Sequence, residues 1–95
     1  MDTIGNGVQR EESSRHVRYD LIPPEAIIAL AEVLYEGSKK YGDRNWEKGI
    51  PVQNCLDHCL GHLMQYQLGD TAEPHLKHAL CNLAMAVAMA ERGKE

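Results

Sequence analysis

The chain has 95 residues, of which 43% are apolar, with a single Trp, no Phe and a formal net charge of −4 at pH 7. A chain of this length is enough for one domain and buries only a modest part of its surface as a monomer, so we expect a homo-oligomer. The negative charge argues against a protein that coats a nucleic acid polymer, because such proteins need a basic surface.

The cysteines and the apolar runs favour an intracellular protein. Cys55, Cys59 and Cys81 are an odd number with no signal peptide ahead of them, which disfavours a disulfide framework and favours a reducing compartment. No apolar run reaches the length needed to span a membrane. We therefore expect a soluble cytoplasmic protein with no membrane partner.

The N-terminal part of the chain differs in composition from the rest. Residues 1–17 are rich in Gly, Ser, Glu and Arg and carry few periodic apolar residues, which is typical of a flexible arm. We expect a single domain over residues 18–95. Its first helix is predicted over about residues 24–41, because prolines suit the first helical positions and Gly42 favours a left-handed cap.

Three carboxylates of this first helix fall within one narrow arc, at i, i+7 and i+11: Glu25, Glu32 and Glu36. Such a row could hold Mg²⁺ and, through it, a triphosphate. The simpler interpretation is a solvated stripe opposite the apolar arc of an amphipathic helix.

The loop that follows, bounded by glycines and by Pro51, concentrates groups suited to a nucleotide. Trp46 offers a flat stacking surface, Arg44 can contact phosphate, and Asn45 can pair with a base edge. The alternative interpretation is an Asx-type turn whose tryptophan anchors the loop on the core. The two interpretations are compatible.

The second helix is predicted to begin at Val52 or Asn54 and to end near Leu68. Its thiols and imidazoles recur at spacings that permit metal ligation: Cys55, His58, Cys59 and His62. A zinc site needs about four converging ligands, however, and the apolar arc of this helix favours Cys59 as an ordinary buried thiol. His62 borders that arc, where a histidine either hydrogen-bonds inside a cleft or stays partly exposed between helices.

The third helix is predicted over about residues 74–92, with apolar residues around most of its axis, which predicts burial on most sides. His75, His78 and Asn82 form a polar line on it, where each unsatisfied group would cost about 1–3 kcal/mol. Either hydrogen bonds to the second helix satisfy this line, or it forms the wall of a pocket for a nucleobase or ribose. The fold class is therefore all-α, a small bundle of three main helices completed by homo-oligomerisation.

Four segments resemble successive blocks of one known family: RYDLIPPEA, GSKKYGDRNWEKGI, LGHL and PHLKHALCNLA. They are similar to phage-type dATP/dGTP diphosphohydrolases, which are related to the MazG-like all-α nucleoside triphosphate pyrophosphohydrolases. The resemblance implies that residues 18–95 form a nucleotide-binding domain. It also implies Mg²⁺-dependent cleavage of dATP or dGTP to the monophosphate and pyrophosphate. The acidic loop, residues 69–74, is shorter here than in longer members.

The positions touched by the resemblance, combined with those singled out by their chemistry, give two candidate sets. The nucleotide-binding set is Arg18, Asp20, Lys40, Tyr41, Asp43, Arg44, Asn45, Trp46, His62, His75, His78 and Asn82. The metal set is Glu25, Glu32, Glu36 and Asp70. No residue is assigned a catalytic role.

These sets leave more than one function open. The first is a Mg²⁺-dependent hydrolase that acts on a purine nucleotide. The second is a non-catalytic sponge, which needs only stacking and phosphate contacts and would sequester a cyclic nucleotide or an ADP-ribose-derived immune signal in the host cytoplasm as a phage anti-defence protein. A third is a helical interaction module that keeps the scaffold without a ligand.

Overall fold

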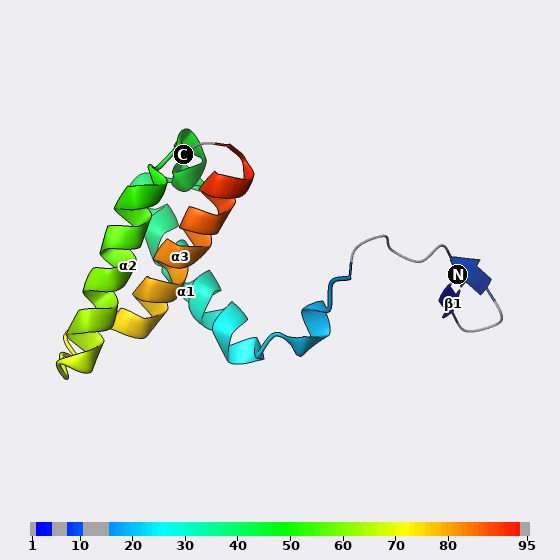
Figure 1. Ribbon diagram of the computed structural model, residues 1–95, viewed down its shortest axis with the longest axis horizontal. Helices are drawn as coiled ribbons and strands as arrows, with labels where there is room; N and C mark the ends of the chain where they lie inside the picture. Colours follow the sequence, from blue (N-terminus) through cyan, green and yellow to red (C-terminus); the bar gives the residue numbers. More distant parts are fainter. Residues whose placement is uncertain (1, 5–7, 11–15, 94–95) are drawn as a thin grey trace.

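The computed structural model describes residues 2–4, 8–10 and 16–93, and its main body is a bundle of helices (Figure 1). Three α-helices form this bundle: α1 (Pro24–Tyr41), α2 (Val52–Gln67) and α3 (His75–Glu91). Two short 3-10 helices, η1 (Tyr19–Leu21) and η2 (Asn45–Lys48), lie before and after α1. The all-α prediction is confirmed, and each α-helix begins and ends within about two residues of its predicted bounds. Among the described residues, none of the helices has the length and hydropathy to cross a membrane.

Local sequence signals set the bounds of α1. Pro24 takes the first helical position, where its missing N–H removes no hydrogen bond. At the other end Gly42 has a φ of 91°, which favours glycine, and its N–H donates to the Ser38 carbonyl at 2.9 Å. The ψ of Gly42, 162°, lies outside the left-handed helical region. Gly42 therefore has the positive φ of the predicted left-handed cap but not its ψ, and the chain leaves α1 in an extended direction.

A glycine turn folds α3 back antiparallel to α2 (Figure 1). α2 ends in a Schellman motif, in which the Asp70 N–H donates to the Gln65 carbonyl at 3.1 Å and the Gly69 N–H donates to the Tyr66 carbonyl at 3.0 Å. Gly69 has the positive φ of 87° that this motif requires. The Asp70 carboxylate then accepts from the Ala72 N–H at 3.1 Å, which tightens the turn and holds Asp70 beside the start of α3.

Small side chains fill the contact between α2 and α3. The buried apolar residues are Cys55, Cys59, Ala79, Ala86 and Met89. Cys59 is therefore a buried thiol, as its arc predicted. α1 packs against α3 but has no buried residue of its own. The core of the single chain is thus mainly a two-helix contact with α1 laid on one side.

One side of the α2–α3 hairpin is apolar and exposed. We call it the α2–α3 apolar face, and its residues are Leu60, Leu63, Met64, Leu76, Leu83 and Val87. On α3 this stripe lies about 100° around the axis from the buried residues that contact α2, while α1 lies toward the opposite side. The prediction that the third helix is buried on most sides is wrong for the single chain, because α1 and α2 cover only part of its circumference.

A short antiparallel ladder lies near the N-terminus, away from the helices in Figure 1. It pairs β1 (Asp2–Ile4) with β2 (Val8–Arg10), and Asp2 stands opposite Arg10. The sequence shows no alternating apolar pattern there, so no strand was expected. The rest of the arm predicted over residues 1–17, apart from 16 and 17, lies outside the described residues.

Candidate functional site

Two adjoining cavities form a trough between α1 and α3. The Trp46 cavity, of about 630 Å³, is bounded by α1, the loop that contains η2, and α3. The Glu32 cavity, of about 560 Å³, is bounded by α1 and the first turn of α3. Both are lined by the same residues of α1: Val33, Tyr35, Gly37 and Tyr41. The two cavities therefore adjoin along these residues of α1.

The loop between α1 and α2 places Trp46 at one end of the trough. Arg44 adopts a left-handed φ of 52°, which turns the chain directly into η2, and Gly49 ends η2 with a φ of 102°. The Arg92 guanidinium, just after α3, lies over the indole with 4.6 Å between its carbon and the ring centroid. Glu47 lies 3.8 Å from Arg44 and 3.9 Å from Arg92, so these charges hold the loop against the end of α3.

The Trp46 cavity combines apolar walls with a polar rim. Ile50 and Met85 contribute to the walls, and Asp43, Asn45 and the half-buried Asn82 contribute polar groups. This mixture suits a flat heteroaromatic group, which needs an apolar contact for its faces and hydrogen bonds for its edges.

One hydrogen bond fixes the amide of Asn82. Its Nδ2 donates to the His78 carbonyl at 2.9 Å, which identifies the nitrogen because a carbonyl can only accept. Its Oδ1 accepts no hydrogen bond from the described part of the chain. Asn82 can therefore offer a ligand its Oδ1 as an acceptor and the second N–H of its Nδ2 as a donor.

The Glu32 cavity is lined by charges of both signs. Glu32 accepts from the Lys77 ammonium at 3.1 Å, and Glu36 lies 3.8 Å from Lys39. Lys40 lines the same cavity. These ion pairs are exposed and contribute little to stability, so both carboxylates can exchange a lysine for another cation without a large penalty.

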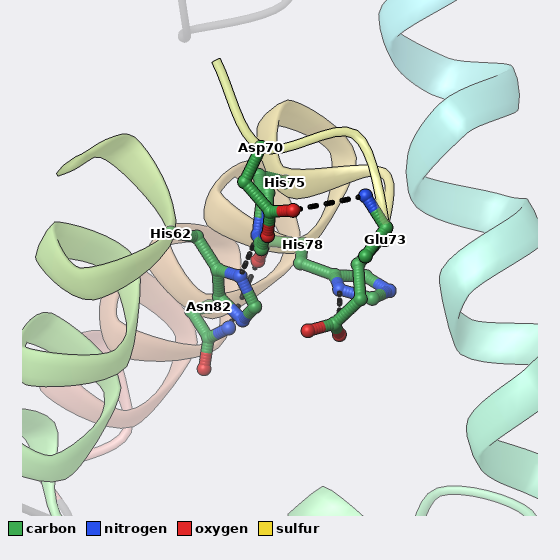
Figure 2. A network of polar contacts seen from close by, with 7 residues as sticks. His62, Asp70, Glu73, His75, His78 and Asn82 are labelled. Atoms are coloured by element: carbon green, nitrogen blue, oxygen red, sulfur yellow. Dashed lines mark hydrogen bonds and ion pairs between the residues drawn. The ribbon is translucent and has the colours of Figure 1, made fainter. Parts of the chain in front are cut away.

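A hydrogen-bonded chain of histidines lies outside the trough, where α2 ends and α3 begins (Figure 2). His75 is only 3% exposed, and its Nε2 donates to Asp70 Oδ2 at 2.6 Å. In the neutral ring His75 Nδ1 is then an acceptor, so His62 Nδ1, at 2.8 Å, donates to it. The interhelical network considered for the polar line of α3 is thus formed at His75.

The surroundings of this chain shift two pKa values. The hydrogen bond from His75 lowers the pKa of Asp70, and the bond from the Ala72 N–H lowers it further. Burial lowers the pKa of His62, and the nearby His78 adds to this effect. His62 and Asp70 also line a separate open groove of about 400 Å³ with Asp57 and Glu73, which favours donor groups over phosphate.

The candidate residues from the sequence separate into two groups. Those that line the trough are Glu32, Glu36, Lys40, Tyr41, Asp43, Arg44, Asn45, Trp46, His78 and Asn82. Those outside its lining are Arg18, Asp20, Glu25, His62, Asp70 and His75. The proposed sets therefore do not form one site in a single chain.

The residues outside the trough either lie at a distant position along α1 or are engaged by other groups. Arg18 and Asp20 lie at the opposite end of α1 from Trp46, and they bind each other through two contacts of 2.8 and 2.7 Å. This pairing lowers the pKa of Asp20. Glu25 is exposed in the first turn of α1, well before Glu32. The Asp70 carboxylate is engaged by His75 and by the Ala72 N–H.

Three charged residues in the trough or beside it were not singled out in the sequence: Lys77, which lines the Glu32 cavity, and Arg92 and Glu73, which contact lining residues. Lys77 reaches Glu32 across 45 positions in the chain, so no local signal indicates this pair. Arg92 likewise meets Trp46 only through the tertiary fold. Glu73 stands five residues before His78 and contacts it in the structure. The one sequence signal for this pair was a carboxylate placed just before a helix that begins with histidines.

No group of three or more His, Cys, Asp or Glu side chains in the described part of the chain is arranged to hold a metal ion. This also applies to the cysteines and histidines of α2. Glu32 and Glu36 are a pair of carboxylates one helical turn apart on the wall of the same cavity.

Comparison with known proteins gives one family match. A family model described as dATP/dGTP diphosphohydrolase, N-terminal, matches residues 6–95. No curated protein and no solved structure gives a significant match. The match covers α1, α2 and α3 and both cavities of the trough.

Proposed function

Since the match shows that the chain belongs to the dATP/dGTP diphosphohydrolase family, we propose that its trough binds a purine deoxynucleoside triphosphate and hydrolyses it to the monophosphate and pyrophosphate. One observation supports this most directly. The cavity with the tryptophan adjoins the cavity with paired carboxylates and lysines, and four residues of α1 line both. A nucleotide has the same division into a flat base and a charged phosphate chain.

The base is proposed to bind in the Trp46 cavity. The indole lines this cavity while Arg92 stacks on it, so its orientation is fixed before a ligand arrives. A preorganised stacking surface adds affinity because little side-chain entropy is lost on binding. Asn45 and the acceptor of Asn82 are available for the base edge.

The phosphates are proposed to bind in the Glu32 cavity, beside Lys40 and Lys77. Mg²⁺ would be held there by Glu32 and Glu36, whose oxygens are the hard ligands it prefers. When bound, the ion would neutralise charge on the phosphates and polarise the phosphorus–oxygen bond that is cleaved. Mg²⁺ sites often use one or two carboxylates and complete the shell with water and substrate phosphates, which fits this pair.

The metal proposal has a binding test that does not need turnover. Because the protein offers two carboxylates, Mg²⁺ alone should bind weakly, and it should bind tightly only together with a dATP analogue that resists cleavage between the α and β phosphates. Isothermal titration calorimetry with Mg²⁺, with the analogue and with both measures this. Tight binding of Mg²⁺ to the protein alone would contradict the two-carboxylate site.

Turnover is tested by incubating the protein with dATP or dGTP and Mg²⁺ and measuring pyrophosphate. Glu32→Gln should lower kcat by a factor of about 100 or more, since metal-assisted charge stabilisation is worth several kcal/mol. Glu25→Gln is the matched control, because this carboxylate of the same helix lies outside the trough. If intact nucleotide is recovered stoichiometrically after heating, the protein is a nucleotide sponge and the hydrolase proposal is wrong.

A second copy of the chain is the proposed partner of the α2–α3 apolar face. The chain has 7669 Å² of accessible surface, against about 5500 Å² for a compact monomer of its mass. Part of this excess belongs to the exposed residues 16–23 and part to the apolar face. Two antiparallel helices with a shared apolar stripe can pair with the same surface of a second copy, which gives a closed dimer.

A further inference from the structure

We propose that His78, oriented by Glu73, is the proton acceptor for the water that attacks the substrate in the Glu32 cavity. This inference rests on the proposed hydrolase function and assigns it a catalytic base. Nothing in the metal pair or in the stacking surface supplies such a base. His78 lines the cavity, and Glu73 acts through it as a positioning residue.

The two side chains form a carboxylate–imidazole pair at the start of α3. His78 Nδ1 lies 3.4 Å from Glu73 Oε1, and Figure 2 shows the carboxylate beneath the ring edge that carries this nitrogen. Glu73 precedes α3, and its backbone carbonyl accepts from the His75 N–H at 2.9 Å, which anchors it there. The contact is longer than an ideal hydrogen bond, as catalytic pairs often are before substrate binds.

This pairing selects the tautomer of His78. A carboxylate attracts the N–H, so Nδ1 carries the proton in the neutral ring and Nε2 keeps its lone pair. In Figure 2 the other ring nitrogen, Nε2, points toward α1. α1 provides the opposite wall of the Glu32 cavity, so the lone pair faces the space proposed for the phosphates and the water.

The neighbouring histidines hold the ring of His78 without competing for its role. His62 meets His78 edge to face, with 5.0 Å between ring centroids and an interplanar angle of 68°. His62 itself donates to His75, which donates to Asp70. That chain joins α2, the turn and the start of α3, so it supports one side of His78, and no described residue hydrogen-bonds to His78 Nε2.

The other acceptors of the cavity are less suited to take this proton. Glu32 is paired with Lys77 at 3.1 Å, and Glu36 lies beside Lys39. In the proposed hydrolase both carboxylates are also the ligands of Mg²⁺, which lowers their basicity. A neutral imidazole accepts a proton near pH 7 and releases it again, which suits a base that must turn over.

The water oxygen forms a bond to the α-phosphorus while its proton passes to His78 Nε2. The bond from the α-phosphorus to the oxygen that bridges to the β-phosphorus breaks, and pyrophosphate leaves with that electron pair. The imidazolium, stabilised by Glu73, then returns the proton to solvent.

The test compares kcat, KM and the pH dependence of kcat in three variants of the full chain. His78→Gln should lower kcat about 100- to 10,000-fold with KM changed less than about 3-fold, and it should remove the acidic limb of the pH profile. Glu73→Gln keeps a hydrogen-bond acceptor without charge, so it should lower kcat less and move the acidic limb to lower pH. His58→Gln is the control, because His58 is an exposed histidine of α2 outside the trough.

Several charged and titratable groups face His78, and each of them can influence the pH dependence of kcat. These are Glu32, Glu36 and Lys40 from α1, His62 from α2, and Glu73, His75 and Lys77 from its own segment. Addition of imidazole to His78→Ala should restore part of the activity, which a purely structural role would not allow. Because added imidazole replaces only the missing side chain, activity that it restores cannot be explained by a change in the stability of the variant.

Each outcome decides between the two proposals. A wild-type kcat that is retained within about 3-fold in His78→Gln, or an unchanged acidic limb in that variant, overturns the assignment of the base and leaves the hydrolase in place. Absence of pyrophosphate release by the wild-type protein overturns both. A large loss of kcat in His78→Gln and a smaller loss in Glu73→Gln, with kcat unchanged in His58→Gln and with imidazole rescue of His78→Ala, support the dyad.

Discussion

At the scale of single residues, Trp46 has two roles that the sequence presented as alternatives. It anchors its loop to the end of α3 under Arg92, and it lines the larger cavity. The first role restricts the motion of the indole, and the second presents it to a ligand. A hydrogen bond between neighbours on one helix, such as that from the Asn82 amide to the His78 carbonyl, could be anticipated from helical spacing. The contact of Trp46 with Arg92 could not, because these residues lie far apart in the sequence.

Replacing Trp46 tests the stacking role. Trp46→Ala should weaken binding of a non-hydrolysable dATP analogue by roughly 5- to 150-fold, because one base-stacking contact is worth about 1–3 kcal/mol. Trp46→Phe keeps a flat ring and should lose much less. Titration calorimetry on both variants measures the difference. Equal loss in both would show that the indole acts through the loop and not by stacking.

His62 provides a prediction on pH and stability. Burial lowers its pKa below the ordinary value of 6.5, so the unfolded chain binds a proton more readily than the folded chain. The contribution of neutral His62 to the free energy of unfolding is therefore fully present above pH 6.5 and is lost as the pH falls below that value. The free energy of unfolding in urea should therefore decrease on acidification in this range, and His62→Gln should reduce the slope.

The Asp70 carboxyl adds a second loss of stability at lower pH. Its pKa is lowered by His75, so its contribution is present above the unfolded value of about 3.9 and is lost as the pH falls through the folded value. The two effects occupy different pH ranges. An unchanged slope near neutral pH in His62→Gln would contradict the assignment to His62.

At the scale of secondary structure, the bounds of all three α-helices could be predicted because prolines and glycines mark them locally. The turn between α2 and α3 was expected only as a break. In the structure it is a Schellman motif followed by a side-chain cap, and it determines where the Asp70 carboxylate lies. The sequence does not show that this turn places the Asp70 carboxylate against His75 and the Ala72 N–H. Asp70 was therefore grouped there with the candidate metal ligands by its residue type.

Two glycines of α2 and its turn make a matched pair for testing this element. Gly69 has a positive φ, so Gly69→Ala should destabilise the protein by about 1–2 kcal/mol. Gly61 lies inside α2 with open space around an added Cβ, so Gly61→Ala should stabilise by up to about 1 kcal/mol. Urea denaturation of both variants measures the two effects, and the same sign in both would contradict the Schellman assignment.

At the scale of the whole molecule, the trough and the α2–α3 apolar face lie on different sides of α3. α1 and the loop with Trp46 form the trough with one side, and the apolar face is formed by another side together with α2. The all-α class followed from the helical patterns of the sequence, and the need to cover apolar surface followed from the short length of the chain. The trough could not be predicted, because its walls depend on tertiary contacts such as Glu32 with Lys77.

The separation of these surfaces leads to a prediction on assembly. Val87, 55% exposed, lies within the apolar face, so Val87→Glu should convert an oligomer to monomers because it buries a charge in the contact. Tyr19→Glu, in η1 at 73% exposure, is the matched control. Sedimentation velocity measures the state of each. A monomeric wild-type protein would contradict the proposed pairing of two copies.

Trp46 is the single tryptophan of the chain, and it stands at the edge of the larger cavity. Its ultraviolet emission therefore originates from one place only, and that place is the proposed base subsite. Any purine that settles against the indole should quench this signal, so ligand screening and stopped-flow measurements of arrival and departure need no attached dye. The molecule carries its own optical reporter.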